Sequence, residues 1–63
     1  MKVRDLIKLL ESKGWQHMRT TGSHRIFKHA TKVRLVTVAG KPGEDVPAGT
    51  LKGILKDAGL ESR

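Results

Sequence analysis

The apolar residues near the N-terminus recur with the period of an α-helix. Four of them have the spacing i, i+3, i+4 and i+7, which places them on one helical face: Val3, Leu6, Ile7 and Leu10. This pattern predicts a helix over residues 3–13. Gly14 then supplies the left-handed residue that commonly ends a helix, and Trp15 follows where it can cover Leu10.

The last part of the chain repeats the same pattern. Its apolar stripe comprises Leu51, Ile54, Leu55 and Ala58. Pro47 suits the first turn of a helix, because the N–H that it lacks would have no partner there. Gly59 can end this helix, and Leu60 can cover Leu55. A second helix is therefore predicted between Pro47 and Gly59.

The sequence between the two helices has the features of β-strands. Three runs with strand-forming residues are separated by turn sequences at Thr21-Gly22 and Ala30-Thr31. A loop containing Gly and Pro follows at 39–46. The predicted strands are residues 15–20, 23–29 and 32–38.

The predicted order α-β-β-β-α defines an α+β fold. Short turns make the three strands an antiparallel meander, and two helices with one apolar stripe each can cover one face of that sheet. The other face stays open to solvent, as antiparallel sheets permit. Because Ile26 and Phe27 are adjacent, they point to opposite sides of their strand, so one of them must lie on the open face or at an edge.

The length and charge of the chain limit what it can do. Its 63 residues allow one domain, residues 1–63, with a thin core, so any active site must lie on the surface. Thirteen Lys and Arg oppose six Asp and Glu, and the net charge of +7 attracts polyanions such as nucleic acid. The alternative is that the basic surface only keeps the protein in solution.

Other features of the sequence point to the cytoplasm. There is no cysteine, which suits a reducing compartment. No apolar run approaches the ~20 residues that span a bilayer. Neither helix has the aromatic-rich apolar face of an interfacial helix, so no membrane partner is expected. The N-terminal residues have helical spacing and not the apolar run of an export signal.

His24 is the residue best placed to carry chemistry. It follows a turn and enters a strand, so the turn exposes it and the strand fixes it, as a general acid or base requires. Cations that could hold a phosphate near it are Arg19, Arg25, Lys28 and Lys32. A lone histidine is not a motif, and a surface or hydrogen-bonding role is the alternative for His24. That plainer role is our interpretation of His17 and His29.

No metal or cofactor site is predicted. Glu44-Asp45 is a single carboxylate pair without a second cluster at ligand spacing. The Gly-containing loop at 40–43 lacks the strand–loop–helix spacing of a phosphate-binding loop. Trp15 and Phe27 are expected in the core, so contacts to nucleic acid should run mainly to phosphate and sugar.

Three segments, covering nearly the whole chain, match a known pattern in order and without insertions. They are Leu6-Ile7 through Leu9-Leu10 to Lys13-Gly14-Trp15, then Gly22-Ser23-His24 with Phe27 after two further residues, then Pro47-Ala48-Gly49-Thr50-Leu51 leading to Ile54-Leu55-Lys56 and Ala58-Gly59-Leu60. Together they resemble the HicA family of bacterial mRNA interferase toxins, also called YcfA-like proteins.

The resemblance implies a fold, an activity and a partner. The fold is similar to a double-stranded-RNA-binding domain. The activity is that of a type II toxin–antitoxin toxin, a metal-independent endoribonuclease that cleaves mRNA and inhibits translation. The family's single catalytic histidine maps onto His24, with Gly22 and Ser23 of the same motif expected beside the RNA. The expected partner is a HicB-like antitoxin protein, and no small-molecule cofactor is implied.

The chain departs from the family pattern after the third strand. Many relatives carry Pro and His there, whereas this chain has Ala39-Gly40. The departure leaves open which group complements His24, and whether His24 takes or gives a proton. Two alternatives use the same charge and fold: a non-catalytic RNA-binding module, and a module whose basic face docks an acidic protein.

Overall fold

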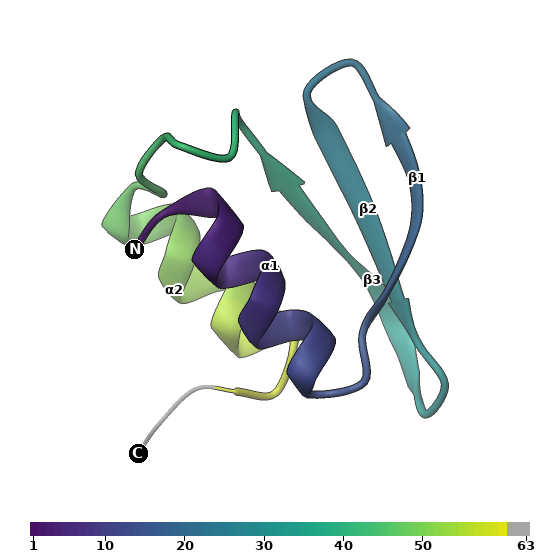
Figure 1. Cartoon of the computed structure of the whole chain (residues 1–63). Helices are drawn as coiled ribbons and strands as arrows, with labels where there is room; N and C mark the ends of the chain where they lie inside the picture. The colour runs from purple at the N-terminus through teal and green to yellow at the C-terminus, as the bar shows by residue number, and fades with distance from the viewer. Residues whose placement is uncertain (61–63) are drawn as a thin grey trace.

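The protein folds into two helices and a three-stranded sheet (Figure 1). The computed structural model describes residues 1–60, so the last part of the predicted domain, 61–63, lies outside the described residues. The elements are α1 (Val3–Ser12), β1 (Gln16–Thr21), β2 (His24–His29), β3 (Lys32–Ala39) and α2 (Ala48–Asp57). The predicted α-β-β-β-α order and the α+β class are confirmed.

Both helices end in the same hydrogen-bonded motif. After α1, Gly14 has φ +93° and donates its N–H to the carbonyl of Glu11, while the Trp15 N–H bonds Leu10 O at 3.0 Å. After α2, the N–H of Leu60 bonds Leu55 O at 2.8 Å. These bonds satisfy carbonyls that a helix end leaves free, and they turn Trp15 back onto the core.

The strands form one antiparallel sheet in the order β1-β2-β3. The first turn is Gly22-Ser23, one residue later than predicted, and Thr21 and His24 therefore lie opposite each other. Pairing is irregular in two places, between His17 and Arg19 on β1 and between Phe27 and His29 on β2. Such irregularities increase the local twist of a sheet.

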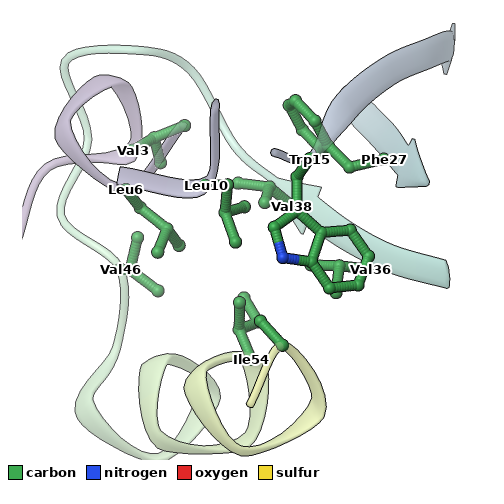
Figure 2. Close-up of a cluster of buried hydrophobic side chains, with 10 residues drawn as sticks. Val3, Leu6, Leu10, Trp15, Phe27, Val36, Val38, Val46 and Ile54 are labelled. Carbon is green, nitrogen blue, oxygen red and sulfur yellow. The ribbon is translucent and has the colours of Figure 1, made fainter. Parts of the chain in front are cut away.

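The core lies between the helices and one face of the sheet (Figures 1 and 2). Its buried side chains are Val3, Leu6, Leu10, Trp15, Phe27, Val36, Val38, Val46, Ile54 and Ala58. Trp15 and Phe27 are thus in the core, as predicted. The indole N–H of Trp15 has no hydrogen-bond partner among residues 1–60, so Trp15 stabilises the fold through the packing of its ring.

The opposite face of the sheet is open, also as predicted. Phe27 and Val36 are partners across β2 and β3 and are both buried, which identifies the face under the helices. Ile26 and its partner Thr37 therefore lie on the open face, and Ile26 is half-buried there. Ile26 is the apolar residue that had to occupy this face.

The loop between β3 and α2 is bonded to the start of α1. The first N–H groups of α1 donate to this loop: Val3 N–H to Glu44 O at 2.8 Å, and Arg4 N–H to Pro42 O at 3.1 Å. Lys2 also forms an ion pair with Asp45 at 3.5 Å. Because a helix start leaves its first N–H groups without partners, these contacts order the loop and the helix together. Within the described residues, no helix is both long and apolar enough to cross a membrane.

Candidate nucleic-acid interface

His24 is the first residue of β2, directly after the Gly22-Ser23 turn. Arg25 pairs with the buried Val38, so Arg25 faces the helices and His24 faces the open side. The direct partners of His24 are Thr21 on β1 and Ala39 on β3. Both are small and exposed, so the imidazole is open to solvent at a fixed backbone position.

The other two histidines have structural contacts. His29 bonds Lys13 O through Nε2 at 2.9 Å and accepts the Thr31 N–H at Nδ1 at 3.1 Å, with its ring edge against Trp15. A carbonyl only accepts and a backbone N–H only donates, so Nε2 carries the proton. These bonds tie the end of α1 to the sheet, in the hydrogen-bonding role predicted for His29.

His17 belongs to the helix side of the sheet. It is the β1 partner of Phe27, against whose ring it packs, and its Nε2 lies 2.9 Å from Thr20 Oγ1. By contrast, the side chain of His24 has no hydrogen-bond or ion-pair partner within residues 1–60. Among the three histidines, His24 alone has both ring nitrogens available to a ligand.

Two of the predicted phosphate-binding cations share the open face with His24. Arg19 pairs with Ile26, two residues along β2 from His24, and Lys28 lies four residues along. At about 3.3 Å per residue along a strand and about 4.8 Å between strands, the backbone of Arg19 is about 8 Å from that of His24, and the backbone of Lys28 is about 13 Å away. Both side chains are exposed. Arg19 can therefore act near a phosphate at His24, whereas Lys28 can only contact a neighbouring one.

The other two cations lie on the helix side. Arg25 is half-buried, and its Nη1 donates to Gly40 O at 3.3 Å. Lys32 pairs with His29 at the far end of the sheet, and its Nζ would lie 3.2 Å from a Cβ placed on Gly59, after α2. The structure thus places Arg19 and Lys28 on the same face of the sheet as His24, and it separates Arg25 and Lys32 from that face.

The turn before His24 is open. A Cβ placed on Gly22 would meet no atom within 4 Å, and Ser23 is exposed. Ser23 O accepts the N–H of Gly40 at 3.2 Å, so the turn is joined to the start of the β3–α2 loop. A ligand at His24 can therefore reach the backbone of this turn without displacing a side chain.

Charge is distributed unevenly between the two layers. Residues 15–39, which contain the whole sheet, include no Asp or Glu. The Lys and Arg of this segment are Arg19, Arg25, Lys28, Lys32 and Arg34. Only Arg34 is paired with a carboxylate in the described structure, Asp57 of α2, at 3.4 Å. The sheet therefore has a positive electrostatic field, and the described carboxylates reduce it only near the edges of the sheet.

The arrangement is a surface site. The described part of the chain encloses no pocket, and it gathers no group of three or more side chains of the types that hold metal ions. A ligand would lie across the sheet and contact the imidazole, the cations and the turn backbone. That geometry suits an extended polyanion, because its repeating charges can meet several cations at once.

Two further residues, which were not predicted from the sequence, lie at the His24 end of the sheet. Thr21 is the direct β1 partner of His24, and Lys41 comes two residues after Ala39, its β3 partner. The strand pattern alone could have suggested Thr21, since a turn one residue later puts it opposite His24. Lys41 could be found only from the pairing of β2 with β3 and the path of the loop.

Comparison with known proteins identifies the family of the chain. The family model described as HicA toxin of bacterial toxin–antitoxin matches residues 3–60 of the 63. A search of curated proteins found no match. The family match spans both helices and the whole sheet, and it places the protein among the toxins of bacterial toxin–antitoxin pairs. The chain belongs to the HicA toxin family.

Proposed function

We propose that this toxin is a metal-independent endoribonuclease that cleaves mRNA in the cytoplasm and so inhibits translation. The observation that carries the proposal is the state of His24. It alone among the three histidines has no hydrogen-bond or ion-pair partner for its side chain within residues 1–60, and it stands on an open, positively charged sheet face. A general acid or base needs such access together with a fixed backbone.

The proposed reaction is attack of an RNA 2′-OH on the adjacent phosphorus. The new bond joins the 2′ oxygen to phosphorus, and the bond from phosphorus to the 5′ oxygen breaks. The products are a 2′,3′-cyclic phosphate and a 5′-OH. One proton leaves the 2′-OH and one joins the 5′ oxygen; His24 carries out one of these transfers and water the other. A single acid–base residue typically contributes about 10²–10⁴-fold to a rate, so the enzyme should be modest.

The residues around His24 would hold the RNA backbone. Arg19 lies close enough to act on the phosphate at His24, and Lys28 on a neighbouring one. Gly22 and Ser23 offer an exposed turn backbone on the same side of the site. We expect smaller contributions from Arg25 and Lys32, which must reach around the sheet from the helix side.

The proposed protein partner is a HicB-like antitoxin that covers the His24 face. Membership of a toxin–antitoxin family implies a neutralising partner, and the positive sheet would speed association with an acidic one. Such a protein could block RNA by occupying the phosphate-binding surface. A purified HicB-like antitoxin that binds this toxin should then compete with RNA, and simultaneous binding of both would contradict this proposal.

The decisive experiment is incubation of the purified protein with mixed RNA, with and without a chelator, beside the His24→Ala variant. We expect cutting in chelator and loss of at least 10²-fold in rate for the variant, with unchanged circular dichroism. DNA of equal sequence should resist, because it lacks the 2′-OH. Cutting that requires magnesium, or a folded His24→Ala protein that cuts at the parental rate, would refute the mechanism. RNA binding without any cutting would favour the non-catalytic module.

A further inference from the structure

We propose that Lys41 binds the scissile phosphate beside His24. The proposal rests on the endoribonuclease function and names a substrate contact for it. The pairing of β2 and β3 brings Lys41 to this site from a distant part of the sequence. His24 pairs with Ala39, the Gly40 N–H bonds Ser23 O at 3.2 Å, and Lys41 is next in the chain.

The backbone of Lys41 is held in place by several hydrogen bonds. Its N–H donates to the carboxylate Oε1 of Glu44 at 2.6 Å, and its carbonyl accepts the Glu44 N–H at 3.0 Å. The preceding carbonyl, of Gly40, accepts Nη1 of Arg25 at 3.3 Å. Glu44 is in turn bonded to the start of α1 through Val3. The loop therefore holds Lys41 at one end of the sheet.

The ammonium group of Lys41 is available to a ligand. The side chain is exposed, and within residues 1–60 no carboxylate forms an ion pair with it. The nearby carboxylate of Glu44 is engaged by the backbone N–H of Lys41. Lysine commonly binds phosphate oxygens, because its flexible four-carbon side chain carries a compact, positively charged ammonium group.

Distance separates Lys41 from the other cations. Lys41 is two residues past Ala39, the β3 partner of His24, so its Cα lies no more than about 7 Å from the Cα of Ala39, a gap comparable to the length of a lysine side chain. Lys28, about 13 Å along β2, can contact only a neighbouring phosphate. Arg19 approaches His24 from β1 and Lys41 from the end of β3, so the two would bracket one phosphate. Cations in that position stabilise charge as it develops on the phosphoryl oxygens.

The test compares Lys41→Ala and Lys41→Arg with Lys8→Ala. Lys8 is exposed on α1, so its loss removes the same charge away from the sheet. The hydrogen bonds that Lys41 makes within the loop use its backbone and not its side chain, so each variant should fold, which circular dichroism checks. We expect Lys41→Ala to lower kcat/KM about tenfold to a hundredfold. Removal of a hydrogen-bond donor from an enclosed oxyanion hole typically lowers the rate by ~10²–10³, and the effect should be smaller here because solvent screens the site. Most of the loss should be in kcat, Lys41→Arg should restore much of it, and Lys8→Ala should stay within about twofold of the parent.

A second measurement does not depend on cleavage. In the His24→Ala background, binding of single-stranded RNA is measured across a salt series. Lys41→Ala should reduce the log–log slope by up to about 0.7, the value for one lost phosphate contact, and Lys8→Ala should change it less. Equal effects of Lys41→Ala and Lys8→Ala in both assays would overturn the proposal, as would a rise in KM alone. If the parent protein does not cut RNA, the endoribonuclease function fails, and the binding series still decides whether Lys41 contacts phosphate.

Discussion

The three histidines show how local bonding decides what one residue type can do. His29 uses both ring nitrogens within the fold, and His17 uses one nitrogen and packs against Phe27. His24 uses neither within the described residues and stands between two small neighbours, Thr21 and Ala39. A histidine bonded as His29 is would have to break structural contacts before it could exchange a proton with a substrate. His24 has no such contacts to lose.

The contacts of His29 predict a cost to stability and none to catalysis. His29→Ala removes three hydrogen bonds of a half-buried ring, one to Lys13 and two to Thr31, and its edge contact with Trp15. We expect a loss of about 1–2 kcal/mol in the free energy of unfolding, measured by urea denaturation. In a domain of this size each kcal/mol corresponds to roughly 4–8 °C in Tm.

The control for this prediction is His17→Ala. His17 is exposed and bonds only a neighbouring threonine, so its removal should cost less than that of His29. Cleavage by both variants should match the parent at temperatures where they are folded. A His29→Ala protein as stable as the parent would show that the link between α1 and the sheet contributes nothing. Loss of cleavage by a folded His29→Ala protein would instead give His29 a role in the reaction.

At the scale of elements, the helices could be predicted more closely than the strand register. The signals that end α1 and α2 are local: a left-handed glycine and an apolar residue next to it. Register depends on the turn. A turn at Thr21-Gly22 would set Arg19 opposite His24, whereas the observed turn at Gly22-Ser23 sets Arg19 opposite Ile26. One residue of turn position thus moved a candidate phosphate contact by two residues.

The faces of the sheet explain what else the sequence could not supply. Arg25 is adjacent to His24 in the chain, but strand alternation places it on the helix side, where its guanidinium donates a hydrogen bond to the carbonyl of Gly40. Lys32 follows the second turn and extends toward the end of α2. Lys41 is remote in sequence yet lies at the His24 end of the sheet. Sequence adjacency identified the histidine, whereas its surroundings depended on pairing between distant segments.

The end of α1 gives a prediction about how two elements are joined. Gly14 has φ +93°, and a Cβ there would lie 2.9 Å from Nε2 of His29. Gly14→Ala should therefore lower the free energy of unfolding by ~1–2 kcal/mol, because alanine is strained in the left-handed region. It should also displace the His29 ring from the carbonyl of Lys13. Gly59→Ala, after α2, has the same backbone strain, but its Cβ would meet only the mobile end of Lys32. We expect Gly14→Ala to be the more destabilising change, by about 1 kcal/mol.

A double-mutant cycle separates the two parts of that cost. In the His29→Ala background the ring is gone, so the penalty of Gly14→Ala should fall to about that of Gly59→Ala. The measurement is urea denaturation of the single and double variants. A Gly14→Ala penalty that is the same with and without His29 would mean that the backbone strain accounts for all of it.

At the scale of the whole molecule, the two layers divide the charge between them. The sheet segment, residues 15–39, has no acidic residue, whereas every carboxylate in the described structure lies on a helix or in the β3–α2 loop. The helix layer also carries cations, among them Lys8 and Lys52, but acidic residues offset them. The net charge of +7 therefore does not describe a uniform surface. It describes a positive sheet next to a mixed helical layer, and a polyanion should prefer the sheet.

This division predicts that the location of a positive charge matters more than its number. One double variant, Arg19→Ala with Lys28→Ala, removes two cations from the open sheet face; another, Lys8→Ala with Lys52→Ala, removes two from the helices. Both lower the net charge equally. Binding is measured in the His24→Ala background so that RNA survives. The sheet variant should weaken single-stranded RNA binding strongly. It should also reduce the slope of log binding constant against log salt concentration by up to about 1.4, which is twice the ~0.7 expected for one phosphate contact. The helix variant should leave most of the affinity and the slope intact, because the charges that it removes act on RNA only through the screened long-range field.

Equal losses in the two variants would mean that RNA responds to total charge alone, and a larger loss in the helix variant would move the RNA site to α1 and α2.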